Sequence, residues 1–167
     1  DVSIQRSMLQ EEIVYAETHM KTIEREMKEL IAADSNICRN YKLLTSIKGV
    51  GPITAIVMLC STLNFTKITD HRKFACYCGL APFEHSSGTS VRGGCHTSSM
   101  ANRDIKVQLN RSALIAIRCD PQLKAYYERK VAEGKHKFSV LNAVRAKIAA
   151  RCFAVVRRGT PYVALQI

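Results

Sequence analysis

The 167-residue chain carries 25 Lys and Arg against 14 Asp and Glu, a formal net charge of +11, and has room for one core with an appended segment. It has no apolar run long enough to cross a membrane and no secretory signal pattern, so we expect a soluble, cytoplasmic protein without a membrane partner. Because it starts at Asp1 and enters a helical pattern at once, we interpret it as a piece of a longer protein.

The charge is distributed unevenly along the chain. Residues 1–35 contain four basic and eight acidic residues, a net charge of −4, whereas residues 36–167 contain 21 basic and six acidic residues, a net charge of +15. Such an excess favours a polyanionic partner, with nucleic acid as the first candidate. The alternative is a basic surface that serves only solubility.

Residues 1–35 are predicted to form a coiled-coil dimerisation helix. Their apolar residues recur in steps of three and four over about four heptads, with Arg6 at the one polar position of the seam. The apolar members of the seam are Val2, Leu9, Ile13, Ala16, Met20, Ile23, Met27 and Leu30. The pattern predicts a homo-oligomer, and the alternative is a single amphipathic helix that docks on the basic domain.

A glycine turn between two helical patterns is the first candidate binding element. The pattern from Ile37 to Ile47 is followed by Lys48-Gly49-Val50-Gly51, and Pro52 suits the first position of a new helix. Glycines allow a sharp turn and a close approach to another molecule, and the amides at a helix N-terminus bind phosphate. The four turn residues are therefore candidate DNA-binding residues of a helix-hairpin-helix motif, although an ordinary helical connector would look similar.

The rest of residues 36–167 predicts an all-α DNA-binding domain with one long loop. We expect further helices near residues 70–77, 101–118, 121–133 and 139–158. The loop runs from Phe83 to Asp104, and segments 83–85 and 90–92 could pair as a short β-hairpin within it. The last helix should present a surface to a nucleic-acid backbone through Arg145, Lys147, Arg151, Arg157 and Arg158.

Neither the cysteines nor the acidic residues indicate a metal site. The seven cysteines lack the paired spacing of zinc ligands, and most lie among apolar residues, so we interpret them as reduced thiols buried in the core. The six carboxylates of residues 36–167 are scattered, whereas metal-dependent cleavage of nucleic acid needs several that converge. We therefore expect no metal and no cofactor in this chain.

The long loop contains a candidate nucleophile. Ser86 and Ser87 precede Gly88, with His85 beside them. A serine hydroxyl that attacks a phosphodiester needs a proton acceptor and cations that neutralise the phosphoryl oxygens. Arg92, Arg103 and Lys106 follow in the sequence. Many serine-rich and glycine-rich loops carry no chemistry, so a plain loop is the alternative.

The ordered segments LLTSIKGVGPITAIVML, FACYCGLAPFEHSSG and NRDIKVQLNRSALIAI, within residues 40–118, resemble the C-terminal transposase domain of the insertion-sequence family that includes the Piv DNA invertase. The resemblance implies a separate N-terminal RuvC-like domain with a DEDD carboxylate set, which would hold Mg²⁺ in the parent enzyme. It also implies a dimerising coiled coil. Because some members are guided by RNA, a guide RNA is a further partner that the resemblance allows.

The resemblance also implies residue roles. Ser87 would attack a DNA phosphate and hold it covalently, with Ser86 as the alternative if the alignment shifts by one residue. Where the family has lysine, glycine and arginine after this motif, the chain has Ser99, Ala101 and Lys106. Cations that could replace the missing ones are Arg92, Arg103 and Arg111.

Three functions follow as hypotheses. The first is the DNA-binding, serine-bearing part of an insertion-sequence transposase, which is inactive without its RuvC-like domain. The second is a helix-hairpin-helix module that binds DNA and dimerises without any chemistry. The third is a coiled-coil interaction protein whose basic part binds acidic proteins.

Overall fold

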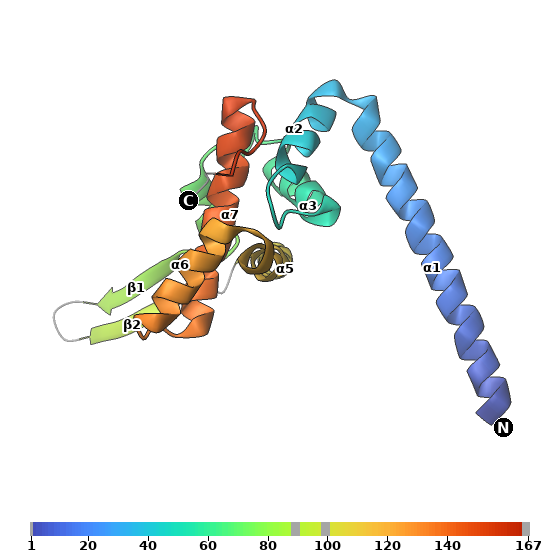
Figure 1. Cartoon of the computed structure of the whole chain (residues 1–167), viewed down its shortest axis with the longest axis horizontal. Coiled ribbons are helices and arrows are strands. Elements are labelled where there is room, and N and C mark those ends of the chain that lie inside the picture. The colour runs from blue at the N-terminus through green and yellow to red at the C-terminus, as the bar shows by residue number, and fades with distance from the viewer. Residues whose placement is uncertain (1, 88–90, 98–100, 165–167) are drawn as a thin grey trace. The chain divides into compact units, whose positions relative to one another are not determined.

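The computed structural model describes residues 2–87, 91–97 and 101–164, with side chains for 2–81 and 101–164 (Figure 1). The chain divides into two units, Asp1–Cys38 and Arg39–Ile167. The described residues form seven helices and one antiparallel hairpin, so the predicted helical fold class is confirmed. None of the described helices combines the length and the apolar character that crossing a bilayer requires.

The first unit is dominated by one long helix, α1 (Val2–Ala33), which buries none of its described residues. Apolar side chains along it are exposed, including Leu9 at 58% and Ile13 at 52%. Asp34 then ends the helix and caps the next, because its carboxylate accepts hydrogen bonds from the amides of Asn36 and Ile37. A coiled coil through this stripe stays a prediction.

The glycine turn joins α2 (Ser35–Thr45) to α3 (Pro52–Thr62) and packs on α5 (Arg103–Cys119). Gly49 has a φ of +92°, and a Cβ atom there would lie 2.7 Å from both the Ala116 Cβ and the Ser112 carbonyl oxygen. A buried hydrogen bond of 2.9 Å between the hydroxyls of Thr54 and Ser112 joins α3 to α5. The turn is therefore part of the core packing, and Gly49 is needed for both its backbone angle and its lack of a side chain.

The short helix α4 (His71–Tyr77) is capped by Asp70, whose carboxylate accepts hydrogen bonds from the amides of Arg72 and Lys73. These amides lower the pKa of the Asp70 carboxyl. Phe74 is fully buried against Phe153 of α7 (Lys137–Arg158), with ring centroids 5.4 Å apart. This aromatic contact holds α4 against α7.

The hairpin consists of β1 (Pro82–Ser87) and β2 (Val91–Thr97). The register pairs Glu84 with Cys95 and Ser86 with Arg92, so one residue of β1 stands opposite two of β2. The two residues are Gly93 and Gly94, which tolerate the backbone angles of a bulge. The hairpin interrupts the helices between α4 and α5.

The core of the second unit forms where α7 packs on α4, α5 and α6 (Pro121–Ala132) (Figure 1). Asp120 lies between α5 and α6 and is only 1% exposed. Its carboxylate accepts a hydrogen bond from the Leu123 amide and forms an ion pair of 2.7 Å with the Arg151 guanidinium. Tyr162 covers this pair, with the Arg151 guanidinium carbon 4.7 Å from its ring centroid.

The interpretation of the cysteines as core thiols is wrong for most of the described ones. Cys78 and Cys152 are buried, and desolvation raises their pKa values to about 11 and about 12. Cys60 and Cys119 are exposed, and the remaining two, Cys38 and Cys76, are half-buried. Apolar neighbours in sequence misled this interpretation, because the helical period places adjacent residues on different faces.

We expect Gly49→Ala to destabilise the second unit by about 2 to 4 kcal/mol, because it combines a left-handed φ with a clash against α5. Gly51→Ser is the matched control. Gly51 has a φ of −86°, a Cβ atom there would meet nothing within 4 Å, and serine is a good helix N-cap. Urea unfolding should show a loss for Gly49→Ala and none for Gly51→Ser; equal stabilities would contradict the packing role of Gly49.

Asp120→Ala should lower the free energy of unfolding by about 3 to 5 kcal/mol, since it removes a helix cap and leaves the Arg151 guanidinium without its counter-ion. Glu133→Ala serves as the control, because that carboxylate forms only exposed ion pairs with Arg129 and Lys130. Thermal unfolding followed by circular dichroism measures both. A loss for Asp120→Ala no greater than that for Glu133→Ala would show that the buried pair contributes little.

Candidate functional site

The glycine turn offers only part of its residues to a ligand. Lys48 is exposed, whereas the Val50 side chain is 5% exposed and its amide donates to the Ile47 carbonyl. Gly51 is the N-cap of α3, and no side chain caps this helix terminus. Lys48, Gly51 and the first-turn amides of α3 are thus the groups of the turn that can contact an anion.

The three predicted cations of α5 lie at different places on the helix. Lys106 is half-buried, whereas Arg103 and Arg111 are exposed. Lys106 precedes Ser112 by six residues, which corresponds to about 9 Å along the axis and to another face of the helix. Since Ser112 is where the glycine turn packs, Lys106 and the turn belong to different surfaces. Arg103, three residues before Lys106, shares the Lys106 face.

The predicted nucleophiles lie in the hairpin. Ser86 pairs with Arg92 across the strands, whereas Ser87 pairs with Val91 and is the last residue of β1. The side chains of these residues lie outside those that the structure describes. The register thus brings the backbone of Ser86, rather than that of Ser87, opposite the predicted cation Arg92.

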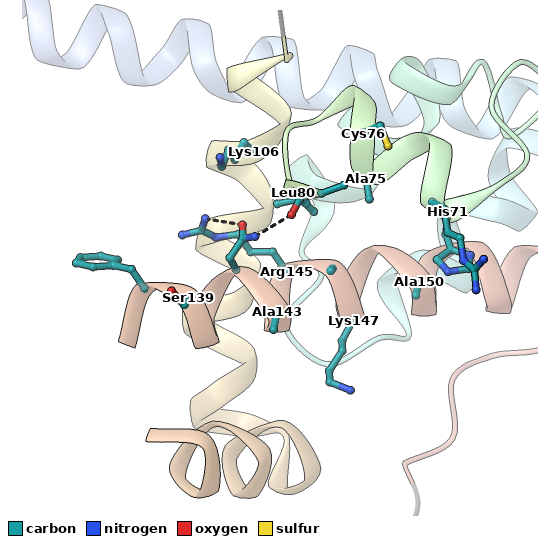
Figure 2. A pocket seen from close by; sticks show the side chains of 15 residues that line it. His71, Ala75, Cys76, Leu80, Lys106, Ser139, Ala143, Arg145, Lys147 and Ala150 are labelled. Carbon is teal, nitrogen blue, oxygen red and sulfur yellow. Dashed lines mark hydrogen bonds between the residues drawn. The ribbon is translucent and has the colours of Figure 1, made fainter. Parts of the chain in front are cut away.

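An open groove of about 1090 Å³ runs along α7 beside α4, with Lys106 of α5 at its wall (Figure 2). Five alanines are among its lining residues. Its basic lining residues are His71, Arg72, Lys106, Arg145 and Lys147, and no carboxylate is among the described residues that line it. Leu80 and Ala81 also line the groove, immediately before Pro82 begins β1. The hairpin therefore extends from the edge of the groove.

Arg145 is fixed in the groove by neutral groups. Its guanidinium donates to the Asn110 side-chain oxygen, at 2.6 and 3.2 Å, and to the Asn142 side-chain oxygen at 3.3 Å. Asn142 in turn donates to the Leu80 carbonyl at 2.8 Å. Figure 2 shows Arg145 and Leu80 at the groove, with dashed lines for the hydrogen bonds between the residues drawn. Burial lowers the pKa of Arg145, but arginine stays charged at neutral pH. Its positive charge is oriented without being neutralised.

Sequence reasoning placed Arg145 and Lys147 on a basic surface but missed the two groove residues of α4, His71 and Arg72. The continuous basic surface expected along α7 is also interrupted, because the charge of Arg151 is paired with the buried Asp120. A signal was present in the sequence: α7 contains basic residues and no Asp or Glu at all. That pattern indicates a cationic helix but cannot say which element lies across from it.

No three His, Cys, Asp or Glu side chains come together as a metal-ligand set within the part of the chain whose side chains are described. The described side chains therefore offer no set that fits a bound Mg²⁺.

The chain resembles several known proteins. It is 39% identical to an uncharacterized 43.6 kDa protein of insertion element IS110 from Streptomyces coelicolor over 121 residues, 72% of this chain and 29% of that protein. It is 23% identical to the pilin gene-inverting protein of Moraxella bovis over 141 residues, 84% of this chain and 44% of that protein. It is 28% identical to a probable family 20 transposase of Pseudomonas aeruginosa over 111 residues, 66% of this chain and 31% of that protein.

The chain thus spans less than half the length of each of these three relatives. The family profile of the IS116/IS110/IS902 transposases matches residues 41–128, more than half of the chain, from the end of α2 to α6. The match includes the glycine turn, α4, the hairpin and α5. The chain therefore belongs to the IS116/IS110/IS902 transposase family.

Proposed function

We propose that this chain is the DNA-binding, serine-bearing part of a transposase that acts on DNA in the cytoplasm, together with a RuvC-like domain outside the chain. One observation carries the proposal: a hairpin with two serines extends from the edge of a cationic groove that has no described carboxylate. Family membership supports a role in transposition. One relative is named for inverting a pilin gene, a reaction that also rearranges DNA.

In the proposed reaction, the Ser87 hydroxyl oxygen forms a bond to phosphorus and one bridging oxygen of the phosphodiester leaves with its electron pair. A general base takes the hydroxyl proton, and the leaving oxygen ends as a hydroxyl after protonation. Cations such as Arg92 and Lys106 would neutralise the phosphoryl oxygens. A second attack by a DNA hydroxyl would release the serine and complete strand exchange, so the phosphodiester energy is conserved in the intermediate.

The other elements have supporting roles in this proposal. Lys48, Gly51 and the uncapped amides of α3 would bind a DNA backbone phosphate at a distance from the serines. The exposed apolar stripe of α1 would pair with a second copy as a coiled coil, which supports a homo-oligomer. In this proposal, activity would also need the carboxylates of the RuvC-like domain outside the chain.

We expect Ser87→Ala in the full-length enzyme to reduce strand exchange by at least about 10³-fold, because no covalent intermediate can form. Binding to duplex DNA should stay within about twofold of the unmodified protein, since the hydroxyl contributes little to affinity. A recombination assay and an electrophoretic mobility assay measure the two effects. Ser86→Ala distinguishes the two candidate serines and should retain exchange; full activity of Ser87→Ala would contradict the assignment, and loss of exchange in Ser86→Ala instead would assign the nucleophile to Ser86.

A non-catalytic helix-hairpin-helix module is the second candidate, favoured by the uncapped α3 terminus beside exposed Lys48. Both candidates predict that Lys48→Glu lowers duplex DNA affinity about tenfold and reduces the salt dependence of binding, because a phosphate contact is lost. Lys124→Glu on α6 is the charge-matched control, since Lys124 is exposed and pairs only at 4.0 Å with Glu128. Of the two candidates, only the non-catalytic module predicts that Ser87→Ala leaves strand exchange unchanged.

The third hypothesis, a basic domain that binds acidic proteins, predicts that affinity for duplex DNA does not fall steeply as the salt concentration rises. If affinity for duplex DNA, measured by fluorescence anisotropy, failed to fall steeply between about 50 and 200 mM salt, neither DNA-binding candidate would stand.

A further inference from the structure

We propose that the groove between α4 and α7 binds an unpaired DNA strand, with Phe138 stacking on a base and Arg145 contacting the backbone. The inference rests on the proposed function for the identity of the strand, which would be the segment next to the phosphate attacked in the hairpin. The groove is separate from the glycine turn, because the two contact different faces of α5.

The charge of the groove favours an anion as its ligand. The positive charge of Arg151 is neutralised within the fold, because its guanidinium forms an ion pair with the buried Asp120. Arg145, six residues earlier on the same helix, has only the amide oxygens of Asn110 and Asn142 as described acceptors. A guanidinium has five N–H groups, and these three bonds leave two for a ligand. A half-buried arginine held in this way is suited to a phosphate.

The extent of the groove favours several phosphates rather than one. Its lining on α7 runs from Phe138 to Ala150, thirteen residues or about 18 Å of helix. An unpaired strand carries one phosphate per nucleotide and extends further per nucleotide than the about 3.4 Å of a duplex strand, so this length spans a few nucleotides. The basic residues are also contributed by three helices, α4, α5 and α7, which suits a chain of phosphates better than a single small anion.

An aromatic pair at one end of the groove favours an unpaired base. Phe138 lies in the first turn of α7, lines the groove and is 72% exposed. The His136 ring stacks on it, with centroids 5.6 Å apart and the planes at 29°. The His136 Nδ1 atom also accepts a hydrogen bond from the Phe138 amide, which fixes the pair at the helix start. Bases of a duplex already stack on one another, so this pair suits a single strand.

The groove also leads toward the proposed nucleophiles. Asn142 joins Arg145 to the Leu80 carbonyl, and Leu80 and Ala81 line the groove just before β1 begins at Pro82. A strand held at Arg145 would therefore leave the groove beside the base of the hairpin. This continuity favours DNA as the occupant, since the strand to be cut must reach Ser87 in the proposed reaction.

The test measures the binding of the 167-residue chain to a fluorescein-labelled 12-nucleotide thymidine strand by anisotropy. Phe138→Ala should weaken this binding about tenfold and leave duplex binding within about twofold, because only an unpaired base stacks. Ile115→Ala is the matched control, since Ile115 is an exposed apolar residue of α5 outside the groove. Equal losses for single strand and duplex, or no loss with Phe138→Ala, would overturn the proposal.

The contribution of the positive charge of the groove is tested with the substitution Arg72→Gln. Arg72 is exposed, so its replacement should not disturb the core. The substitution should weaken strand binding about tenfold and reduce the salt dependence, whereas Arg118→Gln, an exposed arginine of α5 outside the groove, should do neither. A 12-nucleotide uridine RNA bound at least tenfold more tightly, with the same sensitivity to Phe138→Ala, would overturn the assignment to DNA. Circular dichroism of each variant confirms that it is folded.

These measurements do not depend on the serine chemistry. If Ser87→Ala abolishes strand exchange in the full-length enzyme while Phe138→Ala leaves single-strand binding unchanged, the groove proposal fails and the proposed function stands. If Phe138→Ala and Arg72→Gln weaken single-strand binding while Ser87→Ala retains exchange, the groove proposal stands and the nucleophile assignment fails.

Discussion

The arrangement of the second unit depends on α7, a long helix that has an apolar face and basic residues but no carboxylate of its own. Its apolar face packs on α4, α5 and α6, with Val144, Ile148 and Cys152 fully buried. Because three helices share this one surface, the basic residues on the rest of α7 are set at fixed positions relative to α4 and α5. The groove exists because of that packing.

Two arginines of α7 show how the same side chain can serve either the fold or a ligand. Arg151 is neutralised by Asp120, which is itself a helix cap, so this pair joins α6 to α7 and its charge is used within the protein. Arg145 is held by two asparagines, which orient a guanidinium without reducing its net charge. A charge that the fold orients but does not neutralise is available to a polyanion.

The two glycines of the turn between α2 and α3 also differ in what they do. Gly49 lies against Ala116 with a left-handed backbone angle, so packing alone accounts for it. Gly51 has an ordinary backbone angle and open space around it, so packing does not account for it. In the proposed function, Gly51 would allow another molecule to approach the start of α3 closely, where no side chain caps the amides.

The sequence by itself determined the local structure and the family. Helix ends followed from residues that act within one turn: Asp70 and Asp120 as caps, Pro52 at a first position and Gly159 in the left-handed conformation at the end of α7. The uneven charge and the ordered motifs pointed to nucleic acid and to this transposase family. These features need no knowledge of which helices meet.

Only the tertiary structure decided the rest. His71 and Arg72 share a groove with Arg145 although some seventy residues separate them, because Phe74 and Phe153 hold α4 against α7. The exposure of Cys60 and Cys119 and the pairing of Ser86 with Arg92 likewise depend on helix facing and strand register. Contacts between distant segments are set by the fit of many side chains at once, and periodicity along the chain carries no record of that fit.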